Sequence, residues 1–167
     1  SVDILHSNNQ ARMIDIGAGG DAAVEERLME ELSVSGKYTV TPQMREKVKD
    51  FWVGYADWEA DAGEIRSVFE DTGYLMDTHT GVASAVCRRY AAETGDQAKM
   101  VVASTASPYK FSRRVLEALT GRQEEADEYR LIDEMSALSG IPIPQAVEEI
   151  RSAPIRHSRE CGRDEMK

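Results

Sequence analysis

Residues 99–111 read Lys-Met-Val-Val-Ala-Ser-Thr-Ala-Ser-Pro-Tyr-Lys-Phe, and this stretch decides the fold that we expect. Its apolar part predicts a short buried strand over residues 100–104. Ser107 suits a helix N-cap and Pro108 the first helical position, so we expect a helix that ends at Gly121. Hydroxyl groups at the carboxyl end of a strand, just before a helix, lie where open α/β sheets bind ligands. A plain capped turn between a strand and a helix would have the same sequence, so the pattern alone leaves both interpretations open.

Most of the remaining chain is predicted to be helical, because apolar residues recur at helical spacing. The predicted helices lie near residues 24–32, 42–55, 64–69, 82–91, 108–120, 131–138 and 144–150. The helix at 42–55 has a broad apolar stripe that favours core packing over partner binding, and the apolar face of 82–91 predicts a well-buried helix. Short strands are also possible at 38–40 and 75–76. One or two short strands cannot form a stable sheet, so the chain resembles a piece of something larger or a helical domain with one embedded strand.

Composition limits the class of protein. A chain of 167 residues with 41% hydrophobic residues can form a single compact body, with a frayed tail at 155–167. A formal net charge of −10 argues against binding to nucleic acids or to acidic membranes. We see no signal peptide and no apolar run long enough to cross a bilayer. The two cysteines cannot form a disulfide framework, so we expect a cytoplasmic protein.

A second polar segment, Asp77-Thr78-His79-Thr80, stands directly before the helix at 82–91. Its side chains suit capping, because Asp77 or Thr80 can accept hydrogen bonds from the first backbone N–H groups of the helix. The three histidines have no spacing typical of metal ligands, so we expect no metal site. No nucleophile elbow is present either.

Two stretches together resemble one enzyme family. Tyr-Leu-Met-Asp-Thr-His-Thr-Gly-Val-Ala at 74–83 and Ser-Thr-Ala-Ser-Pro-Tyr-Lys-Phe at 104–111 are similar to the carboxyl-terminal part of threonine synthase. A looser resemblance extends to residues 1–5, 35–38 and 157–167. The family depends on pyridoxal phosphate and has fold type II, the tryptophan-synthase-β class. The resemblance therefore implies a mainly α chain that is the carboxyl-terminal fragment of an α/β enzyme of fold type II, from a split or truncated gene or a longer protein.

The resemblance also implies the roles of several side chains. In fold type II enzymes, the pyridine nitrogen of the cofactor typically meets a Ser or Thr hydroxyl, and this role falls on Thr105, with Ser104 as the neighbouring possibility. A hydroxyl donates to a neutral ring nitrogen but does not stabilise the protonated ring as a carboxylate would. The resemblance also implies that five residues line the cofactor cleft: Asp77, Thr78, His79, Thr80 and Lys110. A surface role for Lys110 is equally open.

The implied parent enzyme converts O-phosphohomoserine and water into threonine and phosphate. Family members have the lysine that holds the cofactor, and the loop that binds its phosphate, upstream of the region that matches here. We therefore expect no catalytic residue in this chain, no cofactor on the isolated chain, and no activity by itself. Its uncovered apolar surface would favour a homodimer. The alternative function is a non-catalytic helical module for interaction or complementation.

Overall fold

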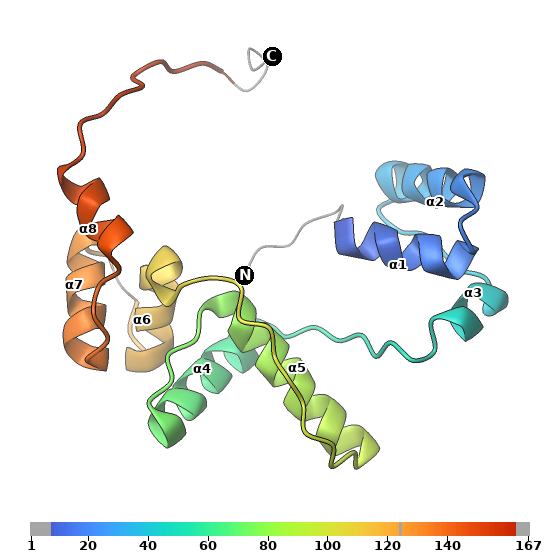
Figure 1. The fold of residues 1–167 in the computed structure, drawn as a ribbon, viewed down its shortest axis with the longest axis horizontal. Coiled ribbons are helices and arrows are strands. Elements are labelled where there is room, and N and C mark those ends of the chain that lie inside the picture. The colour runs from blue at the N-terminus through green and yellow to red at the C-terminus, as the bar shows by residue number, and fades with distance from the viewer. Residues whose placement is uncertain (1–7, 124, 163–167) are drawn as a thin grey trace. The chain divides into compact units, whose positions relative to one another are not determined.

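The computed structural model describes residues 8–123 and 125–162 as a chain of helices joined by extended connections (Figure 1). In order, the helices are α1 (Asn8–Ala18), α2 (Ala22–Ser35), α3 (Pro42–Lys47), α4 (Trp58–Thr72), α5 (Thr78–Thr94), the 3-10 helix η1 (Pro108–Phe111), α6 (Ser112–Thr120), α7 (Glu128–Ser139) and α8 (Gln145–Ser152). The sequence predicts one compact body, whereas the contacts gather in two units. The first unit holds residues 1–55 with 90–96, and the second holds 56–89 with 97–167. The opening at 1–5 and the closing residues 163–167, where we noted a resemblance, lie outside the described part.

The first unit is a small helical cluster formed by α1, α2 and α3. Its core consists of Ile14, Leu28 and Met44. Asp21 and Thr41, residue types that favour helix N-caps, cap α2 and α3: their side chains accept hydrogen bonds from backbone N–H groups of these helices. These caps fix where the helices begin and so which apolar faces meet.

The predicted helix at 42–55 is wrong in its second half, since α3 ends at Lys47. The side chains of Phe51, Trp52 and Tyr55 are exposed by 55%, 39% and 78%. Aromatic and β-branched residues followed by Gly54 have low helix propensity, and burial would be needed to compensate for it. The predicted core stripe therefore does not form.

The second unit has an apolar core around α6 and α7. Its buried members are Leu75, Tyr109, Val115, Leu116, Leu131, Ile132 and Met135. A smaller cluster of Ile65, Met76 and Ala118 joins α6 to α4. The prediction that α6 ends at Gly121 and α7 at Gly140 is confirmed, because both glycines take positive φ, at 69° and 71°. Positive φ is costly for residues with a Cβ, so these glycines define the ends of the two helices.

α5 differs from the prediction of a well-buried helix. Its buried residues are Thr78, Thr80 and Gly81, all in the first turn. The apolar side chains along 82–91 are half-buried or exposed. The sequence pattern identifies an apolar face correctly, but the described residues cover it only in part.

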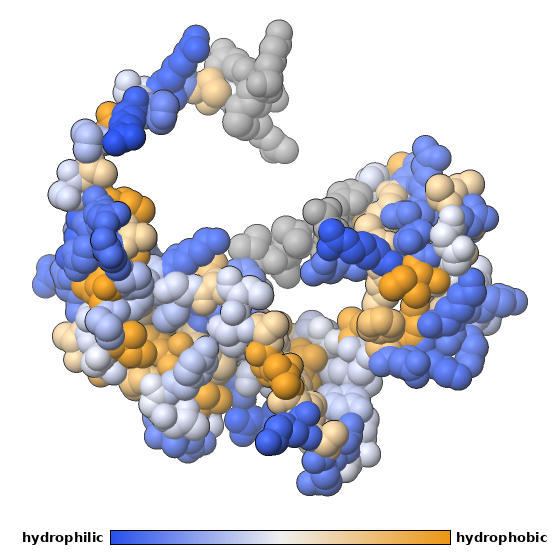
Figure 2. All heavy atoms as spheres, viewed as in Figure 1, coloured by the Kyte–Doolittle hydropathy of each residue, from blue (hydrophilic) through white to orange (hydrophobic). Residues whose placement is uncertain are grey.

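The predicted strand at 100–104 is also wrong, as are the possible strands at 38–40 and 75–76. No strand occurs in residues 8–123 or 125–162. Residues 100–105 run back along α5 as an extended segment (Figure 1), with the Met100 sulfur 3.1 Å from Sγ of Cys87. Val101 is 92% exposed, and Figure 2 shows apolar side chains at the surface over α5 and this segment. A strand needs a neighbour for its N–H and C=O groups, and the described residues provide none.

Residues 154–162 lie outside any helix and are exposed. No helix in the described part of the chain has the length and apolar character needed to cross a membrane.

Candidate functional site

The start of α5 meets the extended segment 100–105 through a row of hydroxyl groups. Tyr74 Oη lies 3.3 Å from Ser104 Oγ, which lies 3.2 Å from Thr80 Oγ1. Thr80 Oγ1 in turn lies 2.5 Å from Oδ2 of Asp77. Asp77 is fully buried and Thr80 is 4% exposed, whereas Tyr74 and Ser104 are at the surface. We call these four residues the hydroxyl relay.

The direction of each hydrogen bond in the relay follows from its buried end. An ionised carboxylate only accepts, so Thr80 donates its single proton to Asp77. Thr80 can then only accept from Ser104, and Ser104 can only accept from Tyr74. Ser104 therefore donates its hydroxyl proton to Thr80, within the relay.

Asp77 also fixes the first turn of α5, as predicted from its place before the helix. Its Oδ1 accepts a hydrogen bond from the backbone N–H of His79 at 2.9 Å. The same oxygen lies 3.3 Å from His79 Nδ1. A carboxylate at a helix N-terminus is also stabilised by the helix dipole. The capping interpretation is confirmed, and it makes Asp77 the fixed end of the relay.

The residues named from the sequence divide into two groups. Asp77, Thr80 and Ser104 come together in the relay, and Thr78 is buried beside them. The His79 ring lies 4.9 Å from the Phe111 ring, and Lys110 Nζ lies 5.5 Å from the centre of that same ring. These two residues thus flank Phe111 rather than join the relay.

Thr105 is the residue that the relay leaves out. It is exposed, and no described residue forms a hydrogen bond with its hydroxyl group. Its backbone position is set by Ser104, the relay member directly before it. Thr105 thus keeps a hydroxyl proton that is available to a ligand, whereas Ser104 does not.

A buried acid lies beneath the first turn of α5. Asp61 on α4 is 2% exposed, and its Oδ1 has no hydrogen-bond partner among the described residues. Burial, with a smaller contribution from the charge of Asp77, raises the pKa of Asp61 to about 6. A Cβ on Gly81 would collide with the Asp61 carboxyl and would lie 2.8 Å from Cγ1 of Ile65. Glycine at this position therefore lets α5 approach α4 closely enough to bury Asp61.

One further polar contact joins α4 to α5. Glu64 Oε1 accepts a hydrogen bond from Ser84 Oγ at 2.7 Å, and Glu64 Oε2 lies 3.0 Å from Nε of Arg88. Glu64 is 8% exposed, so this ion pair is sheltered on one side. The helix pair is thus fixed by polar groups along its length rather than by an apolar core.

Sequence reasoning missed Tyr74, Asp61 and Glu64. The signal for Tyr74 was weak, since it is simply the first residue of the segment 74–83 that we quoted. Asp61 and Glu64 fall at positions three apart on a helix with apolar neighbours, and this spacing places both carboxylates on its buried face. In the described residues, no group of three His, Cys, Asp or Glu side chains has an arrangement that could hold a metal ion.

Comparison with known proteins identifies the family. Residues 80–157 match the family model for the C-terminal domain of threonine synthase. A crystal structure of pyridoxal-phosphate-bound threonine synthase from Brucella melitensis matches with a TM-score of 0.57 and 29% sequence identity. This chain is a threonine synthase-like carboxyl-terminal region. The structural match covers 75% of this chain and 26% of the Brucella chain.

Curated relatives of this threonine synthase-like chain include Threonine synthase-like 1 from Macaca fascicularis and from Homo sapiens. Each is 30% identical over 122 residues, which is 71% of this chain. The chain spans 16% of the length of these relatives. The resemblance noted in the sequence is confirmed. Tyr74 and Asp77 of the relay lie just before the region that matches the family model, and Thr80 and Ser104 lie within it.

Proposed function

We propose that the second unit of this chain forms part of the wall of the cofactor cleft in a threonine synthase-like enzyme. The observation that carries this proposal is the hydroxyl relay, which fixes Ser104 and leaves the Thr105 proton free. The structural neighbour from Brucella melitensis binds pyridoxal phosphate, which supports the same cofactor here.

The residues present fit one part of that cofactor. The pyridine nitrogen of the ring needs a hydrogen-bond donor, and the Thr105 hydroxyl is exposed and has no partner among the described residues. When bound, the ring supplies a sink for electrons from the substrate, and its strength depends on the proton at that nitrogen. A hydroxyl donor leaves the nitrogen neutral, so the ring is a weaker electron sink. Ser104 would position Thr105 through the relay, and Lys110 and His79 would line the cleft on the Phe111 side.

The reaction proposed for the complete enzyme is the conversion of O-phosphohomoserine and water into threonine and phosphate. The proposed contribution of this chain is to bind and orient. The relay holds the segment 100–105 through Ser104. Asp77, directly before α5, is the fixed end of the relay. Covalent catalysis through a lysine requires an amine in a suitable loop. Lysines stand at 37, 47, 49, 99, 110 and 167, and none lies in a sequence context of that kind. We therefore propose that residues 1–167 alone are inactive and bind no cofactor.

The test uses the protein that carries this chain in the cell, assayed for phosphate release from O-phosphohomoserine and for cofactor affinity. Thr105→Val removes the proposed donor and keeps the shape, so we expect a loss of about 1–3 kcal/mol, or roughly tenfold to a hundredfold in cofactor affinity. Thr105→Ser keeps the donor and should retain most of the activity. Normal cofactor affinity in Thr105→Val would remove this residue from the site.

Ser104→Ala separates the two hydroxyl groups. The relay then loses both hydrogen bonds of Ser104, to Thr80 and from Tyr74, but the proposed donor stays, so the loss of affinity should be clearly smaller than in Thr105→Val. A larger loss in Ser104→Ala than in Thr105→Val would make Ser104 the direct donor and would overturn the assignment from the relay. Phosphate release by residues 1–167 alone, with cofactor added, would contradict the proposal of inactivity.

One observation favours the second candidate function, a non-catalytic interaction module. The apolar face of α5 is only partly covered by the described residues, and Val101 is 92% exposed. Exposed apolar surface of this kind favours association, most simply as a two-fold dimer. Light scattering on residues 1–167 tests this, since a strict monomer at high concentration would contradict it.

A further inference from the structure

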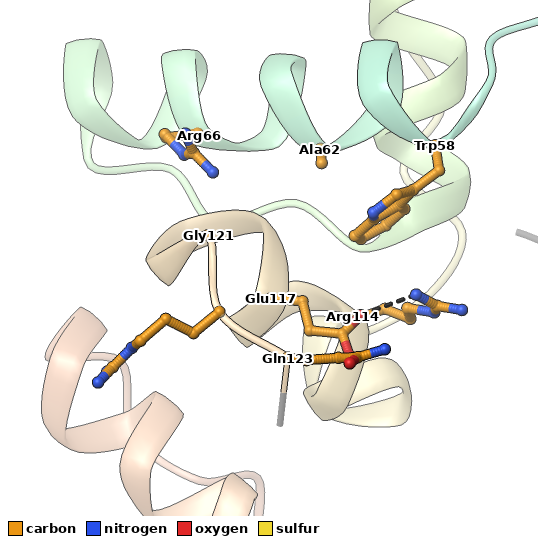
Figure 3. Close-up of a pocket in the computed structure, with 8 residues that line it drawn as sticks. Trp58, Ala62, Arg66, Arg114, Glu117, Gly121 and Gln123 are labelled. Atoms are coloured by element: carbon orange, nitrogen blue, oxygen red, sulfur yellow. Dashed lines mark hydrogen bonds and ion pairs between the residues drawn. The ribbon is translucent and has the colours of Figure 1, made fainter. Parts of the chain in front are cut away.

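A cationic groove lies between α4 and the end of α6, and it shares no residue with the hydroxyl relay. It has a volume of about 430 Å³, and its lining includes Trp58, Arg66, Arg114, Glu117 and Arg122. Figure 3 shows Trp58, Ala62 and Arg66 on α4 facing Arg114, Glu117 and Gly121 across this space. The lining thus contains three arginines and one carboxylate, in a chain whose net charge is −10.

One of the three arginines already has a carboxylate partner within the protein. Arg114 Nη1 lies 2.8 Å from Oε2 of Glu117, and the Arg114 guanidinium lies 4.9 Å from the centre of the Trp58 ring. In this pair Glu117 is 11% exposed and Arg114 is 57% exposed. The charge of the only carboxylate in the groove lining is therefore already balanced by Arg114.

The other two arginines have free donors. Arg66 Nε donates to the carbonyl oxygen of Ala118 at 2.8 Å, which fixes the guanidinium beside the end of α6. No described residue accepts a hydrogen bond from the Nη groups of Arg66 or from the Arg122 side chain, and no described carboxylate forms an ion pair with either residue. Among the described residues, the charges of Arg66 and Arg122 are therefore not balanced by a carboxylate.

We propose that this groove binds a small organic dianion with an apolar body, a phosphate monoester or a dicarboxylate. The fork of Arg66, held by its bond to Ala118, suits two oxygens of one anionic group. Arg122 supplies the second positive charge, and a phosphate monoester carries between about −1.5 and −2 near pH 7. The Trp58 ring, 40% exposed, provides the surface for the apolar body. This inference does not depend on the proposed function, because the groove and the relay have no residue in common.

The test is a titration of the ¹⁵N-labelled chain, followed by the indole N–H signal of Trp58 and the backbone amide of Gly121. Trp52→Phe assigns the Trp58 signal by leaving a single indole. Three probes separate charge from chemistry: phenyl phosphate, isophthalate and, as a monoanion of similar size, benzoate. We expect saturable shifts with both dianions and binding of benzoate that is roughly tenfold weaker. The tighter of the two dianions identifies the anionic group.

Arg122→Ala is the decisive variant, because this side chain is exposed and makes no contact that the fold needs. It should weaken the binding of the dianions roughly tenfold. Arg130→Ala removes an equal charge from an exposed position on α7, outside the groove, and should leave the affinity unchanged. Arg66→Lys keeps the charge but loses the fork, so it should weaken binding severalfold.

Three results would overturn the proposal. One is the absence of a saturable shift at Trp58 and Gly121 with either dianion. Another is an equal effect of Arg122→Ala and Arg130→Ala, which would indicate general attraction by charge. The third is binding of benzoate as tight as that of the dianions, which would show that two negative charges are not recognised.

Discussion

Two parts of the second unit are held together in different ways. α6 and α7 meet through apolar side chains, and Val115, Leu116, Leu131 and Met135 have no exposed surface. α5 meets α4 through polar groups, with Asp61, Glu64, Asp77, Thr78 and Thr80 all buried. Apolar packing is non-directional, whereas buried polar groups require particular partners in particular directions. The first arrangement provides a scaffold, and the second orients specific atoms.

The candidate site lies in the part that is held together by polar groups. The hydroxyl relay and the free Thr105 proton lie on the polar side, where each hydrogen bond has one possible direction. The apolar face of α5 remains half-buried or exposed, so α5 depends for attachment on polar contacts, in its first turn and at Ser84 and Arg88. We expect the α6–α7 region to dominate stability and the α5 region to dominate the geometry of the site.

The largest effect on stability should come from Leu116→Ala, in the middle of the α6–α7 core. Leu116 is fully buried, so its truncation leaves a cavity and should cost about 2–5 kcal/mol of unfolding free energy, measured in urea. Leu138→Ala is the matched control on α7, since Leu138 is 44% exposed, and it should cost less than about 1 kcal/mol. Similar losses in both variants would break the distinction between a packed core and its surface.

The next effect is the pH dependence that Asp61 imposes on the polar side. Its pKa of about 6 in the folded state lies above the ordinary value of 3.8. Between these values the folded state keeps a proton that the unfolded state has lost, so stability falls as pH rises through this window. The cost at pH 7 should be on the order of 1–3 kcal/mol.

Asp61→Asn should remove this part of the pH dependence, and urea unfolding from pH 4 to pH 7 measures it. Asp71→Asn, an exposed change on the same helix, is the control and should keep the wild-type profile. A pH profile unaltered by Asp61→Asn would show that this acid titrates normally. It would then count against the claim that buried polar groups distinguish the contact between α4 and α5.

The smallest effect concerns the two ends of the hydroxyl relay. Thr80→Val leaves Oδ2 of the buried Asp77 without its donor, so we expect a loss of about 1–2 kcal/mol. Tyr74→Phe removes a bond at the exposed end, since Tyr74 is 52% exposed, and should cost less than about 0.5 kcal/mol. Equal losses in the two variants, measured in urea, would show that the relay is not anchored at Asp77.

Local signals in the sequence identified some helix ends, such as the starts of α2 and α3 and the ends of α6 and α7. Caps such as Asp21 and Thr41, and glycines such as Gly121 and Gly140, act within one turn of the chain, so residue type and spacing are sufficient. Whether a strand forms at 100–104 could not be predicted from the neighbouring residues in the sequence. Its apolar run is typical of a strand, but a strand exists only if another segment pairs with it.

The candidate site was predictable as a set of segments but not as a geometry. The motif at 77–80 and the turn at 104–105 were recognised, and the resemblance to threonine synthase joined them. Ser104 contacts Thr80 and Thr105 does not. This difference depends on the path of the chain along α5. The buried state of Asp61 likewise depends on Gly81 in another helix, and no local pattern reports it.

Hydrogen exchange at backbone amides tests most directly the claim that an apolar scaffold carries a helix held mainly by polar contacts. Amides in α6 and α7 should exchange only through global unfolding, whereas those of α5 beyond residue 88, the last of these contacts, should exchange roughly a hundredfold faster or more. That result would support an α5 whose apolar face is only partly covered. Equal protection along α5, α6 and α7 in the monomer would contradict the account.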